Sequence, residues 1–242
     1  MVAAPAPPRI LPSGDAAITV EFSRTIDDDA NRRVLALDRL ISSETLPGVT
    51  ETVPTYRSLL VHYDPLQIGF DALGEKLSEL ALRALPQARA IRRWRIPVAY
   101  GGENGIDLED VAKALNITPD AVVARHVGGD YTVAMIGFTP GWSYLSGLPA
   151  SMQLSRRLNP RLLTPAGTVS IGGIQTGIQC LAGPSGWHLL GRTAVRTYQL
   201  ARDPIFLLEP GDAISFVAVD HKTFAEQDRA AAAGDVVAEL AS

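Results

Sequence analysis

The chain has 242 residues, of which 46% are hydrophobic and 20% are charged, and its formal net charge at pH 7 is −4. The length suits one large domain or two small ones, and the composition is typical of a globular protein. The acidic balance argues against a polyanion-binding surface. Five arginines between Arg83 and Arg95 lack the clustered basic face that nucleic acid requires, so we expect a solvated link there and no nucleic-acid partner.

Cysteine content and hydropathy indicate the compartment. Cys180 is the only cysteine, so no internal disulfide can form, and we expect a cytoplasmic protein in which this thiol is structural. No stretch approaches the roughly 20 apolar residues of a membrane span, so no membrane association is expected. Residues 1–13 lack the basic start and apolar core of a signal peptide and are predicted to be a loose tail.

Residues 1–90 are predicted to form a small α+β domain with the order βαββα. Residues 18–22 alternate apolar and polar positions as a half-buried strand does. Asp27 can cap the helix that follows, whose apolar positions share one face. The remaining elements are two strands and a second helix, at residues 49–53, 58–63 and 70–84. This order predicts a sheet covered by two helices on one face, and residues 89–93 would be the link to the next domain.

Residues 91–222 are predicted to form a β-barrel or sandwich, because Gly- and Pro-rich loops separate many short apolar runs. A first strand around residues 94–98 precedes a short helix at 108–115, and Thr118-Pro119 is a start signal for another helix. Further strands are predicted at residues 131–136, 168–171, 187–190, 205–208 and 213–219. The C-terminal segment 223–242 is predicted to be a helical tail, with an Ala-rich helix over residues 224–240.

Two segments contain more glycine, proline and aromatic residues than packing requires. Residues 137–149 hold Phe138, Pro140, Trp142 and Tyr144 in a loop, which suits the rim of a small-molecule pocket or a partner surface. A tightly packed barrel corner would have the same composition. In residues 164–177 the glycines permit close backbone approach, while Gln175 and Thr176 offer amide and hydroxyl groups.

A third segment, residues 183–193, contains His188 and Arg192. His188 is the histidine best placed for acid–base work, and Arg192 could bind an anionic oxygen. In an extended strand the two side chains would share one face. The alternative is an edge-strand histidine beside a surface salt bridge.

Other kinds of site lack support in the sequence. There is no Walker A motif and no dinucleotide fingerprint. Residues 141–145 lack the second glycine of a nucleophile elbow. Glu103 and Asp107 lie near a helix start, where carboxylates commonly interact with the helix dipole. No metal site is expected, because the four histidines have no paired spacing: His62, His126, His188 and His221.

Four unusual strings follow one another along the chain: GFTPGWSYLSGLP (137–149), TPAGTVSIGGIQTGI (164–178), GPSGWHLLGRT (183–193) and EPGDAISF (209–216). Upstream, the strings YRSLLVHYDP and IPVAYGGENGIDLEDVA fit the same pattern. Together they resemble the B-subunit family of 5-oxoprolinase, also called KipI-like or allophanate hydrolase subunit 1. The resemblance covers nearly the whole chain. The chain departs from the family's usual Tyr-Pro at Gln179-Cys180, close to the expected pocket.

The resemblance implies a cyclophilin-like all-β barrel for the C-terminal domain, of the carboxyltransferase subdomain C and D type. It implies an ATP-dependent hydrolase that converts 5-oxoproline (pyroglutamate), a small cyclic amide, to glutamate. The expected partners are a paralogous C subunit (KipA-like, or allophanate hydrolase subunit 2) together with an A subunit. ATP would be bound by the assembly rather than by this chain, and the isolated chain is expected to be inactive.

If the chain is such an enzyme subunit, the residues of the three segments would form its site. His188 and Arg192 are the predicted catalytic residues, as acid–base group and anion holder. Substrate binding is predicted for Phe138, Pro140, Trp142, Tyr144, Gln175 and Thr176.

Two other functions fit the same strings. KipI-type members are described as inhibitors of a sporulation sensor histidine kinase, and the apolar rim would suit such docking. Related modules form the carboxyltransferase region of urea carboxylase, which requires a biotin carrier.

Overall fold

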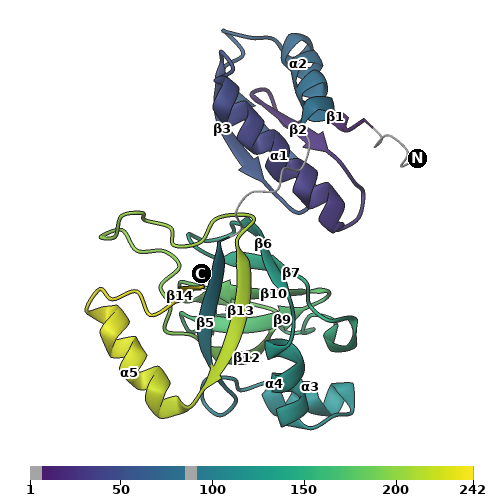
Figure 1. Cartoon of the computed structure of the whole chain (residues 1–242). Coiled ribbons are helices and arrows are strands. Elements are labelled where there is room, and N and C mark those ends of the chain that lie inside the picture. Colours follow the sequence, from purple (N-terminus) through teal and green to yellow (C-terminus); the bar gives the residue numbers. More distant parts are fainter. Residues whose placement is uncertain (1–6, 85–91, 242) are drawn as a thin grey trace. The chain divides into compact units, whose positions relative to one another are not determined.

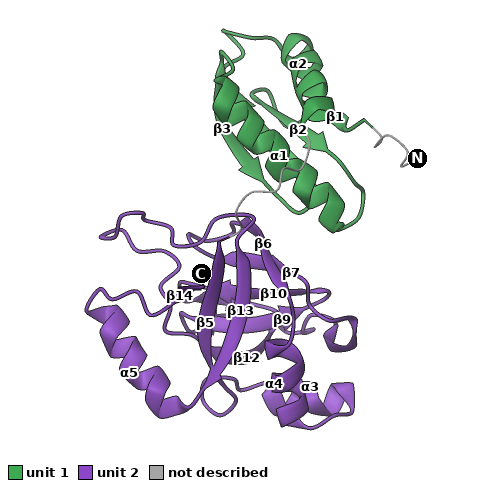
Figure 2. Ribbon diagram, viewed as in Figure 1, with its two compact units in different colours: residues 1–90 green, residues 91–242 purple. Residues whose placement is uncertain are grey.

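The computed structural model describes residues 7–84 and 92–241 of the chain (Figure 1). The chain divides into two compact units, residues 1–90 and 91–242 (Figure 2). The link predicted at residues 89–93 falls mostly outside the described residues. Arg93 is not part of a link, because it begins the first strand of the second unit. Within the described ranges, no helix has the length and apolar character needed to cross a membrane.

The described part of the first unit contains four strands and two helices: β1 (Arg9–Pro12), β2 (Ala17–Glu21), α1 (Asp28–Glu44), β3 (Val49–Pro54), β4 (Ser58–Tyr63) and α2 (Phe70–Arg83). The strands form an antiparallel sheet in the order β1-β2-β4-β3. Strand β1 corrects the expectation of a loose tail. Its residue Arg9 pairs with Glu21 in the ladder and also forms an ion pair with its carboxylate at 2.7 Å.

Local sequence determines how this unit packs. The Asp27 side chain accepts a hydrogen bond from the backbone N–H of Ala30 at 2.7 Å, as predicted for the cap of α1. Strand β4 alternates as a half-buried strand should, with every second side chain buried. One apolar core joins the sheet to both helices, and its fully buried members are Ile18, Val20, Val34, Leu37, Leu59, Val61, Leu73, Leu77 and Leu80.

The described part of the second unit, residues 92–241, is built around a barrel. Its elements are β5 (Arg93–Tyr100), α3 (Leu108–Leu115), α4 (Pro119–Val127), β6 (Tyr131–Ile136), β7 (Ser143–Ser146), the 3₁₀ turn η1 (Ala150–Met152), β8 (Arg161–Thr164), β9 (Thr168–Gly172), β10 (Gln175–Gln179), β11 (Gly183–Ser185), β12 (His188–Arg192), β13 (Ala213–Val219), α5 (His221–Ala232) and β14 (Glu239–Ala241).

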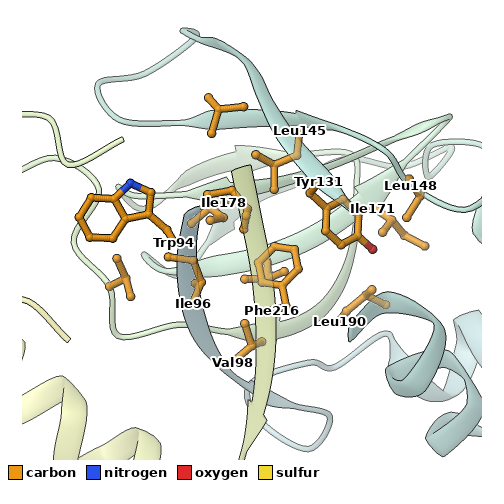
Figure 3. Close-up of a cluster of buried hydrophobic side chains, with 14 of the residues drawn as sticks. Trp94, Ile96, Val98, Tyr131, Leu145, Leu148, Ile171, Ile178, Leu190 and Phe216 are labelled. Atoms are coloured by element: carbon orange, nitrogen blue, oxygen red, sulfur yellow. The ribbon is translucent and has the colours of Figure 1, made fainter. Parts of the chain in front are cut away.

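Seven of these strands close the barrel in the order β12-β9-β10-β7-β6-β13-β5, with β12 pairing back to β5. Neighbouring strands are antiparallel except for β13 and β5, which run parallel. Strand β14 adds to β5 outside the ring, and β8 and β11 form a separate two-stranded ribbon. Apolar side chains from every side of the barrel fill its interior (Figure 3), as expected for a barrel of this size.

Several predicted elements of this unit differ in the structure. Residues 205–208 form no strand, and Phe206 makes only an isolated bridge to Tyr198. The terminal helix ends at Ala232 rather than at residue 240, because the chain turns at Gly234 with φ +108° and then returns as β14 along β5. Strands β7 and β10 lie in segments whose composition predicts loops.

One buried carboxylate fixes the start of β5 and β13. Asp212 accepts hydrogen bonds from Arg92 Nε (2.8 Å) and Nη2 (2.6 Å), from Trp94 Nε1 (3.2 Å) and from the backbone N–H of Glu209 (2.9 Å). Its side chain is almost completely buried. The two parallel strands therefore begin at a charge that is fully hydrogen-bonded, and removing it would leave the Arg92 guanidinium poorly paired.

We expect Asp212→Ala to lower the free energy of unfolding of the barrel by about 3 kcal/mol, because a buried charge network loses its acceptor. Glu239→Ala is the matched control, since Glu239 faces Arg95 of the neighbouring strand at 3.7 Å in an exposed pair and should cost less than about 0.5 kcal/mol. Urea unfolding of both variants measures the difference. Equal losses would contradict the anchoring role of Asp212.

Candidate functional site

The outer surface of strands β7, β10 and β9 carries the candidate site. Successive side chains of a strand point to opposite faces, and Ile178 of β10 lies in the barrel core. Gln175, Gly177 and Gln179 therefore face outward. Gly177 lies between Tyr144 of β7 and Ser170 of β9 in the ladder, so these three positions form a row across the outer face.

Two glycines on this face make room for indole rings. A Cβ atom at Gly172 would lie 2.7 Å from Cγ of Trp187. A Cβ atom at Gly177 would lie 3.3 Å from Cζ3 of Trp187 and 3.4 Å from Nε1 of Trp142. Both indoles thus lie directly on the backbone of β9 and β10. A side chain at either position would push them away.

The indoles belong to an aromatic cluster that consists of Phe138, Trp142, Tyr144 and Trp187. The ring centroids of Trp142 and Trp187 are 6.0 Å apart at 89°, and those of Tyr144 and Trp187 are 5.8 Å apart at 76°. Phe138 contacts Trp142 at 5.4 Å, edge to face, the geometry that aromatic pairs prefer. Both indoles are buried, whereas Phe138 is 66% exposed and has φ +68°. This strained residue places its ring at the surface.

Hydrogen-bonding groups in and beside the cluster lack partners. Trp142 Nε1, Ser170 Oγ and Thr139 Oγ1 are buried and have none within the described part of the chain. Most buried polar groups are hydrogen-bonded, and an unpaired one costs free energy. Trp142 Nε1 and Ser170 Oγ both lie near Gly177. A small molecule bound there could supply the missing acceptor and donor.

Two polar groups border the aromatic rings of the cluster, the phenol of Tyr144 and the guanidinium of Arg156. Burial raises the pKa of the Tyr144 phenol, and the nearby charge of Arg156 opposes that effect. Tyr144 is therefore a neutral hydroxyl at physiological pH. The Arg156 guanidinium lies over the Trp187 ring, 5.7 Å from its centroid. The cluster therefore presents a neutral phenol and a guanidinium group beside stacked aromatic rings.

The structure brings some of the predicted site residues together and separates others. Phe138, Trp142 and Tyr144 form the cluster, Pro140 lies exposed in the same loop, and Gln175 is on the same outer face of β10. Thr176 is on the opposite face, fully buried in the barrel interior. Because side chains alternate along β10, Thr176 does not lie on the face that carries the aromatic cluster.

The expectation that His188 and Arg192 share one face of their strand is wrong. In the ladder with β9, His188 pairs with Ile171 and Arg192 pairs with Thr168. These partners are three positions apart, and the register shifts between Leu189 and Gly191. An extra residue of this kind turns the following side chains to the other face.

His188 and Arg192 also have separate surroundings. His188 Nε2 lies 2.9 Å from the carbonyl oxygen of Ser155. The Nε of Arg192 donates to the carbonyl of Ala166 at 3.1 Å, and its guanidinium lies over the ring of Phe224 on α5. The two side chains therefore belong to two different regions of the barrel surface.

The barrel interior holds a polar network around His126. Thr176 Oγ1 donates to the carbonyl of Ser170 (3.0 Å), so it must accept from His126 Nε2 (3.0 Å). His126 Nδ1 then accepts from the Tyr100 hydroxyl (2.8 Å). The imidazole stacks on Phe216 with centroids 4.6 Å apart. These contacts satisfy both nitrogens of a neutral imidazole, and burial lowers the pKa of His126 to about 3.

Comparison with known proteins identifies the family. A family model described as the carboxyltransferase domain, subdomain C and D, matches residues 8–208. The B subunit of 5-oxoprolinase from Bacillus subtilis (strain 168) is 34% identical over 222 residues, which are 87% of this chain and 92% of that protein. The chain belongs to the B-subunit family of 5-oxoprolinase. The resemblance found in the sequence strings is thereby confirmed.

In some solved structures a similar unit is part of a longer chain. The crystal structure of TTHA0988 is 37% identical with a TM-score of 0.75, and the match covers 84% of this chain and 40% of that one. The chain thus spans less than half the length of that relative. The Kluyveromyces lactis urea carboxylase has a TM-score of 0.78 at 20% identity, over 96% of this chain and 24% of that one, and shares the fold.

In this member of the 5-oxoprolinase B-subunit family, three residues that shape the site have only weak signals in the sequence. The pattern around Trp187 indicates only a strand. Gly172 and Gly177, which lie beneath its ring, could have indicated that a large side chain packs on β9 and β10. Arg156 lies in a segment without a motif. Asp107 was expected to serve the dipole of α3, yet its side chain makes no cap hydrogen bond and binds arginines instead.

We predict that His126 makes the barrel sensitive to acid. Its pKa is about 3 when folded and about 6.5 when unfolded. Between these values the unfolded chain binds more protons, so the free energy of unfolding falls as the pH falls, by up to roughly 1.4 kcal/mol per pH unit. At pH 7 the effect is nearly absent.

Urea unfolding at pH 7 and pH 4.5 tests this prediction. Between pH 7 and pH 4.5, the free energy of unfolding should fall by about 2–3 kcal/mol more in the unmodified protein than in His126→Gln. His62→Gln, which changes a histidine of the other unit, should lose as much as the unmodified protein does. An NMR titration of the His126 ring gives the same information if the variant does not fold. A ring that becomes protonated near pH 6 would refute the prediction.

Proposed function

We propose that this chain is the B subunit of an ATP-dependent 5-oxoprolinase, which converts 5-oxoproline to glutamate together with a paralogous C subunit plus an A subunit. Identity to the Bacillus subtilis B subunit over nearly its full length supports the assignment. The structural observation that carries it is the aromatic cluster with unpartnered buried groups. A lactam has a flat amide that fits against an indole and can accept a hydrogen bond from Trp142 Nε1.

The cluster binds and orients rather than reacts. Opening the lactam adds water to its carbonyl carbon, breaks the C–N bond and leaves the ring nitrogen as the amine of glutamate. Tyr144 is a neutral donor because burial raises its pKa, and Gln175 offers both a donor and an acceptor. None of these groups is a base or nucleophile near neutral pH, so activation by ATP is assigned to the other subunits. The isolated chain is accordingly proposed to be inactive.

We do not assign a joint catalytic role to His188 and Arg192. Because they face opposite sides of β12, one small substrate molecule cannot contact both. A carbonyl oxygen only accepts, so the His188 Nε2 that contacts Ser155 carries a proton and donates it. That nitrogen is then not available as a base while the bond persists.

Exposed leucines beside the site support an interaction with another protein. Leu158, Leu162 and Leu163, on or next to the β8–β11 ribbon, are 97%, 93% and 70% exposed. Such a run of apolar side chains at the surface is typical of an interaction site. We assign this surface to the C subunit, which would cover the cluster from outside.

The enzyme assignment predicts that the three co-expressed subunits form glutamate from 5-oxoproline only when ATP is present. Within that complex, Trp142→Phe should lower kcat/KM roughly tenfold, because the ring is kept and one hydrogen-bond donor is lost. Trp94→Phe is the control, since Trp94 donates to Asp212 away from the cluster. Glutamate is quantified by chromatography.

Absence of glutamate with all three subunits and ATP would refute the enzyme assignment. Inhibition of a sensor kinase's autophosphorylation, or capture of a biotinylated protein, would then favour one of the two alternative functions.

The leucine surface predicts that Leu158→Glu combined with Leu162→Glu abolishes co-purification with the C subunit, because charges would be buried at an apolar contact. Leu66→Glu is the matched control, since Leu66 is 94% exposed in the other unit. Size-exclusion chromatography of the co-expressed pair measures association. An intact complex with the double variant would place the interface elsewhere.

A further inference from the structure

The segment around Arg156 is fixed on both sides. On one side, His188 Nε2 donates to the carbonyl of Ser155 at 2.9 Å. On the other, the backbone N–H of Arg157 donates to the carbonyl of Gly186 at 2.8 Å. Because the residues before and after it are held, the backbone of Arg156 has one place relative to β12 and the aromatic cluster.

A buried carboxylate adds to this fixation. Asp107 accepts from Arg157 Nη1 (3.2 Å) and from Arg161 Nη1 (2.8 Å) and Nη2 (2.6 Å). It also accepts from the backbone N–H of Leu189 at 2.8 Å. Its side chain is only 2% exposed. Such a pair of guanidinium groups on one desolvated carboxylate is rigid, because separating them would leave a buried charge unpaired.

Arg156 is the remaining cation of this segment. Three arginines lie within six residues, and one carboxylate serves two of them, Arg157 and Arg161. No carboxylate of the described residues lies within ion-pair distance of Arg156. Its guanidinium is instead held over the Trp187 ring at 5.7 Å and acts on the Tyr144 phenol. A planar cation beside aromatic rings and unpaired donors suits a carboxylate, which it can bind through two parallel hydrogen bonds.

Resting on the proposed function, we infer that Arg156 binds the carboxylate of 5-oxoproline while the lactam lies against the aromatic cluster. His188 and Asp107 are positioning residues that hold the segment carrying Arg156. This assignment replaces Arg192 as the anion holder, since Arg192 is engaged with Ala166 and Phe224 on a different part of the surface. The site accordingly selects small lactams that bear a carboxylate and discriminates against neutral ones.

The first test uses the complete three-subunit enzyme. Arg156→Gln should raise KM for 5-oxoproline roughly 10–100-fold with a smaller change in kcat, because a charge-assisted bidentate contact is lost. Arg125→Gln, at an exposed position of α4, is the matched control and should leave KM unchanged. An unchanged KM in Arg156→Gln would overturn the inference and leave the proposed function intact.

The role of His188 is tested by rescue. His188→Gln keeps a side-chain N–H that can donate to the Ser155 carbonyl, whereas His188→Ala does not. A positioning role predicts that Ala raises KM, that Gln restores it within about threefold, and that both keep the pH profile of kcat. Loss of kcat in both variants with an altered pH profile would instead mark His188 as an acid–base residue.

Direct binding separates this inference from the proposed function. If the complete set of subunits forms no glutamate, the isolated chain is titrated with 5-oxoproline and with 2-pyrrolidone, which lacks the carboxylate, following tryptophan emission. The inference predicts at least roughly tenfold weaker binding of 2-pyrrolidone, and loss of this preference in Arg156→Gln. Equal binding of the two lactams, or no binding of either, would overturn it.

Discussion

The candidate site depends on the buried carboxylate of Asp107. Asp107 lies at the N-cap of α3, but its side chain makes no cap hydrogen bond. It instead accepts hydrogen bonds from Arg157, from Arg161 and from the backbone N–H of Leu189. A desolvated carboxylate is stable only while these partners stay in place. The ribbon, the segment before it and β12 are therefore held together at one point. These hydrogen bonds to Asp107 therefore also hold the surface that carries Arg156 in place.

The candidate site lies on the outer face of the barrel, because side chains fill the barrel interior. Phe216, Tyr131 and the imidazole of His126 pack together in the core, and their polar atoms are hydrogen-bonded within it. A small barrel of this kind has no room for a ligand. The outer face instead has glycines where side chains would stand, so two indoles lie on the sheet. Such a surface is open on one side, which is why an enclosing partner is part of the proposal.

Sequence patterns predicted the elements in which polarity alternates cleanly, such as residues 58–63, 131–136 and 213–219. They did not predict β7 and β10, because glycine and aromatic residues obscure the alternation there. The separation of His188 from Arg192 depends on one extra residue in β12, for which the local sequence has no sign. Long-range contacts could not be predicted from the sequence either, since the hydrogen bond between His126 and Thr176 forms only when the barrel closes. Trp142 and Tyr144 could be chosen as candidate site residues from the sequence, because aromatic residues flanked by glycine and proline are rare in ordinary strands.

The contact between Gly172 and Trp187 has a consequence for how related sequences vary. The indole fills the volume that any side chain at position 172 would need. The two positions cannot change independently, because a larger residue at one demands a smaller residue at the other. Among homologues, glycine at the end of β9 should therefore accompany a bulky aromatic residue just before β12. Chains that lack this pairing will have reshaped the surface on which the ligand is proposed to lie.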